Sequence, residues 1–139
     1  MIFSKNKEEI TSFQIVTLHT SGMRLTAEYE IVMKGNDAEV SEYFIRYSKN
    51  KDERVLERRA VISAEAALGL LNDCRLISWD GFHGAHPRGV LDGTMFSLKA
   101  VVNEGRVIKA EGSQNFPKRY REFTDGLYGI LSEADKNQE

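Results

Sequence analysis

The sequence has few of the residues that mark secreted or strongly charged proteins. It contains one cysteine, Cys74, among 139 residues, so no disulfide can form within the chain. This suits a reducing compartment, and we expect a cytoplasmic protein. The chain also lacks an excess of one charge, because 19 basic residues stand against 21 acidic ones, a formal net charge of −2. A domain that binds nucleic acid or an anionic membrane usually carries a strong positive field of its own. This chain has no such field, so neither is expected as a partner.

Long apolar runs are missing as well. The stretch from Ala64 to Leu71 contains Glu65 and is far shorter than the roughly 20 residues that span a bilayer. Residues 1–9 carry charges and no apolar segment of the kind found in signal peptides. We therefore expect neither a transmembrane helix nor export.

The residues that are present have the composition of a globular domain. Hydrophobic residues make up 41% of the chain and charged residues 29%. This balance supplies enough apolar surface for one core. No repeat, linker or low-complexity stretch divides the sequence. We expect a single domain over residues 1–139, with an ordered core over 12–131 and frayed polar ends.

Alternating apolar and polar residues predict several strands. They lie at two places within 13–33, around a turn at 20–22, and at 39–48, 55–62, 95–102 and 106–111. The prediction for 55–62 is the weakest, because its Glu57-Arg58-Arg59 run would also suit a helix. A short extended piece is expected at Leu76 to Trp79.

Two helices are predicted. Ser63 suits an N-cap, and apolar residues at three- and four-residue spacing then continue to Cys74. Pro117 suits the first turn of a final helix, where its missing N–H has no partner in any case. Gly126 and Gly129 in that helix each cost about 1 kcal/mol of helix propensity, which predicts a close approach of the backbone to the sheet.

The order of these elements predicts the fold class. Four strands, a helix, a loop, a hairpin and a helix follow one another, and short connections between successive strands favour antiparallel pairing. The polar face of the first strands places both helices on the other side. We therefore predict an α+β protein with two layers, a mainly antiparallel sheet of five to six strands and two helices packed on one face. A sheet wrapped around a helix, as in cystatin-like folds, is also compatible.

The C-terminal half carries a recognisable pattern. Trp79-Asp80-Gly81-Phe82 is followed by Asp92-Gly93 with Phe96 and Leu98, and later by Gly112 with Phe116-Pro117 and Tyr120. This pattern, over about residues 68–131, resembles one found in a family of small uncharacterised bacterial α+β proteins. The resemblance implies a fold and a bacterial source. It implies no activity, ligand or site residue.

The loop after Trp79 has the residue types most suited to chemistry. His83 and His86 lie three residues apart with Asp80 and Asp92 nearby, a donor set that suits a transition metal. No second Cys or His pair completes a structural zinc site, so an ordinary glycine-rich surface loop is the stronger interpretation, and we expect no cofactor. Both aspartates precede glycine, which favours turns over an acid/base pair.

Two further groups are candidate binding residues. Trp79 and Tyr120 suit a small-molecule pocket, although a lone tryptophan at the end of an apolar run is more often part of the core. Lys118, Arg119 and Arg121 crowd the predicted start of the last helix, where backbone amides could help to bind an anion.

These observations favour a non-catalytic binding or interaction domain. Its surface would be a strand edge or the polar strand face around Arg24, Thr26, Glu28 and Glu30, meeting a protein partner or a second copy of the chain. A small metal-dependent or hydrolytic enzyme that uses the His83 loop is one alternative. A protein with a small-molecule pocket is the other.

Overall fold

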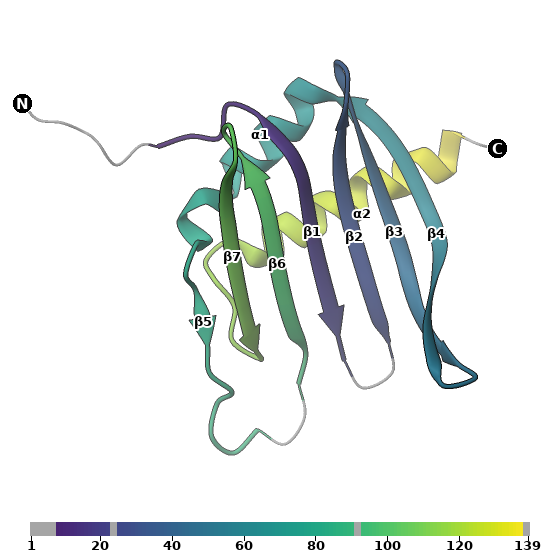
Figure 1. The fold of residues 1–139 in the computed structure, drawn as a ribbon, viewed down its shortest axis with the longest axis vertical. Coiled ribbons are helices and arrows are strands. Elements are labelled where there is room, and N and C mark those ends of the chain that lie inside the picture. Colours follow the sequence, from purple (N-terminus) through teal and green to yellow (C-terminus); the bar gives the residue numbers. More distant parts are fainter. Residues whose placement is uncertain (1–7, 23–24, 91–92, 138–139) are drawn as a thin grey trace, which may run out of the picture.

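The computed structural model describes residues 8–22, 25–90 and 93–137. Its elements, labelled in Figure 1 except for the short 3₁₀ helix, are β1 (Phe13–Ser21), β2 (Thr26–Lys34), β3 (Asp37–Ser48), β4 (Lys51–Ser63), α1 (Ala64–Asp73), the 3₁₀ helix η1 (Leu76–Trp79), β5 (His83–Gly84), β6 (Met95–Val102), β7 (Arg106–Ser113) and α2 (Tyr120–Asn137). Within the described residues, no helix is both long and apolar enough to cross a membrane.

The strands form one seven-stranded sheet with the order β4-β3-β2-β1-β6-β7-β5. All neighbours are antiparallel except β5, which pairs parallel to β7. The predicted α+β class is confirmed. The sheet has one strand more than the upper predicted count, because β5 has only two residues and is too short to show a periodic pattern.

Both helices cover the same face of the sheet, as predicted. In Figure 1 they lie behind the strands, and the face turned toward the viewer is open. Inward-facing residues of the strands and apolar residues of the helices form one buried cluster, with Leu18, Ile31, Trp79 and Phe123 among its largest members. We call the uncovered side of the sheet the open face.

The helix boundaries follow local hydrogen bonds. Ser63 caps α1, because its hydroxyl accepts from the Ala66 amide at 3.0 Å, as the sequence predicts. The final helix starts at Tyr120, later than predicted. Pro117 instead belongs to a preceding turn, in which its carbonyl accepts from the Tyr120 amide, and Arg119 has a left-handed φ of 69°.

Three local predictions are wrong. Leu76–Trp79 is a 3₁₀ helix instead of an extended piece, because Arg75 turns the chain with a left-handed φ of 53° and its carbonyl accepts from the Ser78 amide. At Gly126 the close neighbour is Leu70 of α1 instead of the sheet. A side chain at Gly129 would meet nothing within 4 Å, so no close approach explains that glycine.

The strand predicted at 55–62 is confirmed as part of β4, with an irregularity. Between Arg58 and Leu56 the pairing with β3 skips Glu57, which makes a β-bulge. The alternation of 55–62 predicts that Leu56 shares a face with Ala60 and Ile62. The extra residue moves Leu56 to the other face, and its side chain is 46% exposed.

A buried ion pair lies beside this bulge. The Glu42 carboxylate on β3 is 3% exposed and receives two bonds from Arg58, at 2.7 and 3.2 Å, and one from the Tyr29 hydroxyl at 2.9 Å. A buried charge is tolerated only when it is paired and hydrogen-bonded, so this cluster ties β2, β3 and β4 together.

Candidate binding groove on the open face

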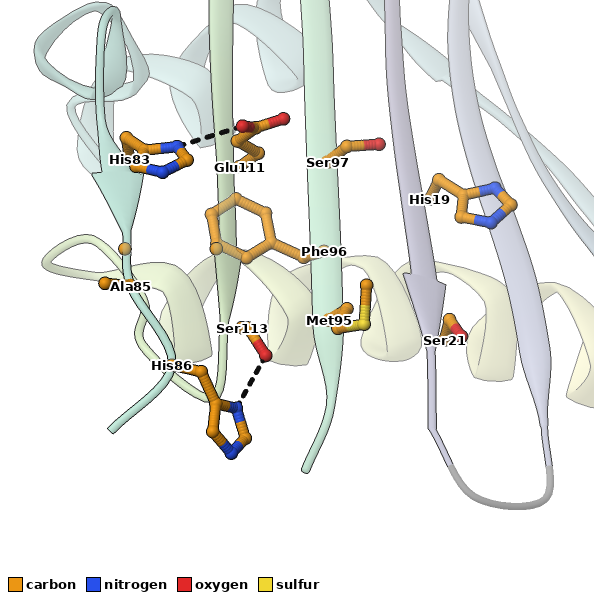
Figure 2. A pocket seen from close by; sticks show the side chains of 12 residues that line it. His19, Ser21, His83, Ala85, His86, Met95, Phe96, Ser97, Glu111 and Ser113 are labelled. Atoms are coloured by element: carbon orange, nitrogen blue, oxygen red, sulfur yellow. Dashed lines mark hydrogen bonds and ion pairs between the residues drawn. The ribbon is translucent and has the colours of Figure 1, made fainter. Parts of the chain in front are cut away.

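The open face is hollowed where β1, β5, β6 and β7 meet. Two depressions of about 470 and 480 Å³ share four lining residues, His19, His83, Ser97 and Glu111, and so form one continuous groove. His86 also lines the first depression, so all three histidines of the chain border this groove. We call it the histidine groove. Figure 2 shows the residues that line the first depression, with β6 and β7 between His83 and His19.

Strand register explains why these side chains meet. In β6, alternate residues such as Phe96 and Leu98 are buried, so the residues between them face the open side. Ser97 lies opposite His19 of β1 and Glu111 of β7, and Glu111 lies opposite His83 of β5. A single cross-strand row of four side chains therefore spans the groove.

Two glycines allow the short edge strand β5 to join the sheet. A Cβ atom added to Gly84 would lie 2.6 Å from the Asn115 carbonyl oxygen, and one added to Gly112 would lie 2.1 Å from it. The segment before α2 therefore passes directly against both strands, and only glycine leaves it room. The Asn115 side chain also donates to the Ala85 carbonyl at 3.2 Å. These contacts position the wall of the groove that carries the two loop histidines.

The histidines on that wall are hydrogen-bonded to β7. His83 Nδ1 lies 2.9 Å from Glu111 Oε2. His86 Nδ1 lies 2.8 Å from the Ser113 hydroxyl, and its Nε2 contacts the Val90 carbonyl. A carbonyl only accepts, so in the neutral His86 ring Nε2 carries the proton and Nδ1 accepts from Ser113. The bonds hold the loop beside β7.

Two lysines occupy one end of the groove. Lys99 of β6 and Lys109 of β7 lie directly opposite each other, and both line the second depression. Within the described residues neither ammonium group has an ion-pair or hydrogen-bond partner. Like charges placed directly opposite each other destabilise a sheet. This end of the groove therefore has an uncompensated positive charge.

In the opposite half of the open face, the charges around Arg54 are paired. Glu28 and Glu30 on β2 both lie close to Arg54 of β4, at 3.2 and 3.7 Å. The Arg54 guanidinium also lies over the Tyr43 ring, 3.8 Å from its centre. The surface predicted around these glutamates thus exists on the open face, with its charges paired within the chain. Thr26 is half-buried there, and Arg24 lies outside the described residues.

The predicted metal residues are only partly brought together. His83 and His86 line the groove, whereas Asp80 accepts from the Lys109 backbone amide at 3.1 Å and lies 3.9 Å from Arg106. Asp92 lies outside the described residues. Across the ranges that the structure describes, no three His, Cys, Asp or Glu side chains are grouped closely enough to hold a metal ion. The metal site stays a prediction.

Trp79 and Tyr120 lie together on the helix-covered side. Trp79 is 1% exposed, its ring lies 5.9 Å from that of Tyr120, and its indole N–H donates to the Lys118 carbonyl at 3.1 Å. Burial raises the pKa of the Tyr120 hydroxyl well above its usual range. Trp79 belongs to the buried cluster and Tyr120 packs against it, which agrees with the interpretation of the tryptophan as a core residue.

The predicted anion-binding residues are divided between the turn before α2 and the helix itself. Lys118 and Arg119 precede the helix and Arg121 follows its first residue. Arg119 donates to the Asp73 carbonyl at 3.3 Å, which fastens this turn to the end of α1. Anion binding at these residues stays a prediction.

Sequence reasoning misses the residues that complete the groove. The pattern around His19 indicates only a boundary residue, and nothing in it singles out Lys99, Lys109, Glu111 or Ser113. The alternation of 95–102 does place Ser97 and Lys99 on one polar face. The neighbours of that face come from β1 and β5, and no local signal indicates those pairings.

Comparison with known proteins identifies no relative. No protein-family model matches the chain, and neither a curated protein nor a solved structure matches it. The resemblance to small bacterial α+β proteins stays a prediction.

Proposed function

We propose that the protein is a non-catalytic binding domain, and that its ligand is a small organic molecule with an anionic group, bound in the histidine groove. The observation that carries the proposal is the opposed lysine pair, Lys99 and Lys109, at one end of that groove. An anion placed between the two ammonium groups would remove a repulsion that the free protein retains.

The contrast with the rest of the open face supports this interpretation. Arg54 on the β4 side has two carboxylate partners and an aromatic ring, which complete its interactions within the chain. The lysine pair on the β6–β7 side has none among the described residues. The charges around Arg54 are thus paired within the chain, whereas the lysines over the groove are not.

The other end of the groove suggests the rest of the ligand. Met95 is 55% exposed there and, with Ala85, contributes apolar surface to the lining of the first depression. Met95 and Lys99 are four residues apart on one strand, a span of about 13 Å. Each depression falls within the several hundred cubic ångströms typical of small-molecule sites. A ligand of this length would place an apolar part against Met95 and its anionic group at the lysines.

A hydrolytic enzyme is a second candidate, supported by one observation. The Ser113 hydroxyl donates to His86 Nδ1 in the neutral ring, while the Val90 carbonyl holds the opposite nitrogen. This is the arrangement of a serine beside an oriented base. Turnover of an activated ester that is lost in Ser113→Ala, with unchanged ligand binding, would support catalysis at this pair.

We propose the cytoplasm as the place of action, because the single thiol, Cys74, is buried and no disulfide supports the fold. Burial raises the pKa of the Cys74 thiol, so the unreactive protonated form is favoured.

The experiment is a thermal-shift titration with matched anions. Straight-chain carboxylates and phosphate monoesters of increasing chain length would be compared with acetate and inorganic phosphate alone. We expect the longer anions of at least one series to raise the melting temperature and the small ions to have little effect. The carboxylate and phosphate series distinguish which head group is bound.

Variants locate the site. Lys99→Ala and Lys109→Ala should each reduce the shift, whereas Lys49→Ala, the same charge change in the exposed turn between β3 and β4, should preserve it. If no anion stabilises the protein, or if the shift is unchanged without the groove lysines, the proposal is wrong.

A further inference from the structure

β4 is the exposed edge of the sheet, and its sequence is complementary to itself. The strand has 13 residues, pairs with β3 on one side and has no neighbouring strand among the described residues on the other. A long edge strand presents unpaired backbone groups that another strand can bind.

The charge order over Asp52–Arg59 is the basis of the inference. It reads acidic, acidic, basic, apolar, apolar, acidic, basic, basic. When a second copy of the segment runs antiparallel to the first, opposite charges face each other at each charged position. Asp52 meets Arg59, Glu53 meets Arg58, and Arg54 meets Glu57. A parallel arrangement in register would instead place every charge beside its like.

The bulge at Glu57 makes this register consistent with the faces of the sheet. Directly opposed residues in an antiparallel pair must point to the same side. In a regular strand, Asp52 and Arg59 would point to opposite sides, because seven positions separate them. The extra residue shifts this alternation by one. Two residues of a bulge oppose one residue of the partner strand, so Arg54 faces Leu56 and Glu57 together.

Contacts within the chain show which side each arginine occupies. Arg54 and Arg59 both contact open-face residues, and Arg58 contacts the inward Glu42. Asp52 lies two residues before Arg54 and therefore shares the open face with Arg59. By the same alternation, Glu53 shares the inner face with Arg58.

The acidic members of the segment are available for a partner. Asp52, Glu53 and Glu57 are exposed, and each lacks an ion-pair or hydrogen-bond partner among the described residues. Their proposed partners are already oriented, since Arg58 is bonded to Glu42 and Arg59 to Ser41. Side chains that are ordered beforehand lose less conformational entropy on association.

We propose that two copies of this chain pair through β4 as a two-fold symmetric, antiparallel dimer. The axis passes near Val55, and the two sheets join into one continuous sheet. Since this axis is perpendicular to the sheet, both histidine grooves lie on the same face of the dimer and all four helices on the other. This inference does not depend on the function of the groove.

Charge-reversed variants test the proposal by mixing. Asp52→Arg places a second guanidinium against Arg59 at both symmetric positions, and Arg59→Asp places a second carboxylate against Asp52. We expect the wild type to sediment at twice its mass of 15.8 kDa. Each variant alone should weaken self-association by about tenfold or more, and an equimolar mixture of the two should recover a heterodimer. Glu104→Arg, in the β6–β7 turn, is the matched control and should dimerise like the wild type.

Two outcomes overturn the proposal. One is a wild type that stays monomeric at every concentration; the other is a dimer that neither reversal weakens.

Because Arg59→Asp also removes the contact with Ser41, thermal melts must first show that the variant is folded. If it is not, hydrogen exchange of the wild type decides: β4 amides gain protection with rising concentration in the proposed dimer, and their protection is independent of concentration if β4 stays free.

Discussion

Lys99 and Lys109 are direct cross-strand neighbours on the open face of the sheet, and no described acidic side chain neutralises them. A repulsion of this kind lowers the stability of the free protein, because like charges are carried at directly opposed positions of adjacent strands. The pairing therefore connects stability and ligand binding through the same two residues.

This relationship predicts that removing the repulsion stabilises the protein and abolishes binding. Lys99→Glu places a carboxylate opposite Lys109, and we expect the free energy of unfolding to rise by about 0.2–1 kcal/mol. The ligand-induced thermal shift should disappear. Urea denaturation and the thermal-shift titration measure the two effects. Lys49→Glu, with the same charge change in the turn between β3 and β4, should leave ligand binding intact.

The buried pair of Glu42 and Arg58 should be strongly coupled. Arg58→Met leaves a carboxylate that is 3% exposed without its counter-ion, and we expect a loss of about 3 kcal/mol of stability. Adding Glu42→Leu should recover most of that loss, because no buried charge remains. Arg54→Ala, at an exposed ion pair, should cost less than about 1 kcal/mol. Additive effects of the Glu42 and Arg58 substitutions in chemical denaturation would contradict this account.

Gly126 and Gly129 form a matched pair within α2. In Gly129→Ala the new methyl group meets nothing within 4 Å, so the gain in helix propensity, about 1 kcal/mol, should appear as added stability. In Gly126→Ala the methyl group would lie 2.6 Å from Leu70 Cδ1, and Leu70 must move. We expect a smaller gain, or a loss, for Gly126→Ala in thermal denaturation. Equal stabilisation by both substitutions would show that α1 and α2 are not closely packed at this point.

Alkaline pH should destabilise the fold through two tyrosines. Burial, helped by hydrogen bonds to Tyr128 and Glu42, raises the pKa of Tyr29, and burial with the nearby Tyr128 raises the pKa of Tyr120. The folded state thus favours the neutral phenols, while the unfolded chain ionises near pH 10. Stability is fully present below that pH and falls as the pH rises above it. Tyr120→Phe should flatten this decline in denaturant titrations between pH 9 and 12, and Tyr47→Phe, at a 68% exposed site, should not.

Local sequence patterns are sufficient for much of the fold. The alternation around Phe96 and Leu98 predicts which side of β6 is buried, and Ser63 predicts the start of α1, because both depend on neighbours within a few residues. Helix placement on one face follows from the polar side of the first strands. The bulge at Glu57 is not predictable in this way, since it depends on pairing with β3.

The candidate site is much less accessible to sequence reasoning. His19 and Ser97 are far apart in the chain and become neighbours only because β1 pairs with β6. The loop histidines can be identified by residue type, but their partners Glu111 and Ser113 come from β7. Pairings between distant strands depend on the topology of the whole sheet, which no single segment encodes.

The most direct test of the proposed function is an NMR titration with a long-chain carboxylate or phosphate monoester. Backbone amide shifts should change for the groove residues of β5, β6 and β7, with the largest changes at Lys99 and Lys109, and the changes should saturate with ligand. Changes confined to the helix-covered side, or none for any of these anions, would contradict the account.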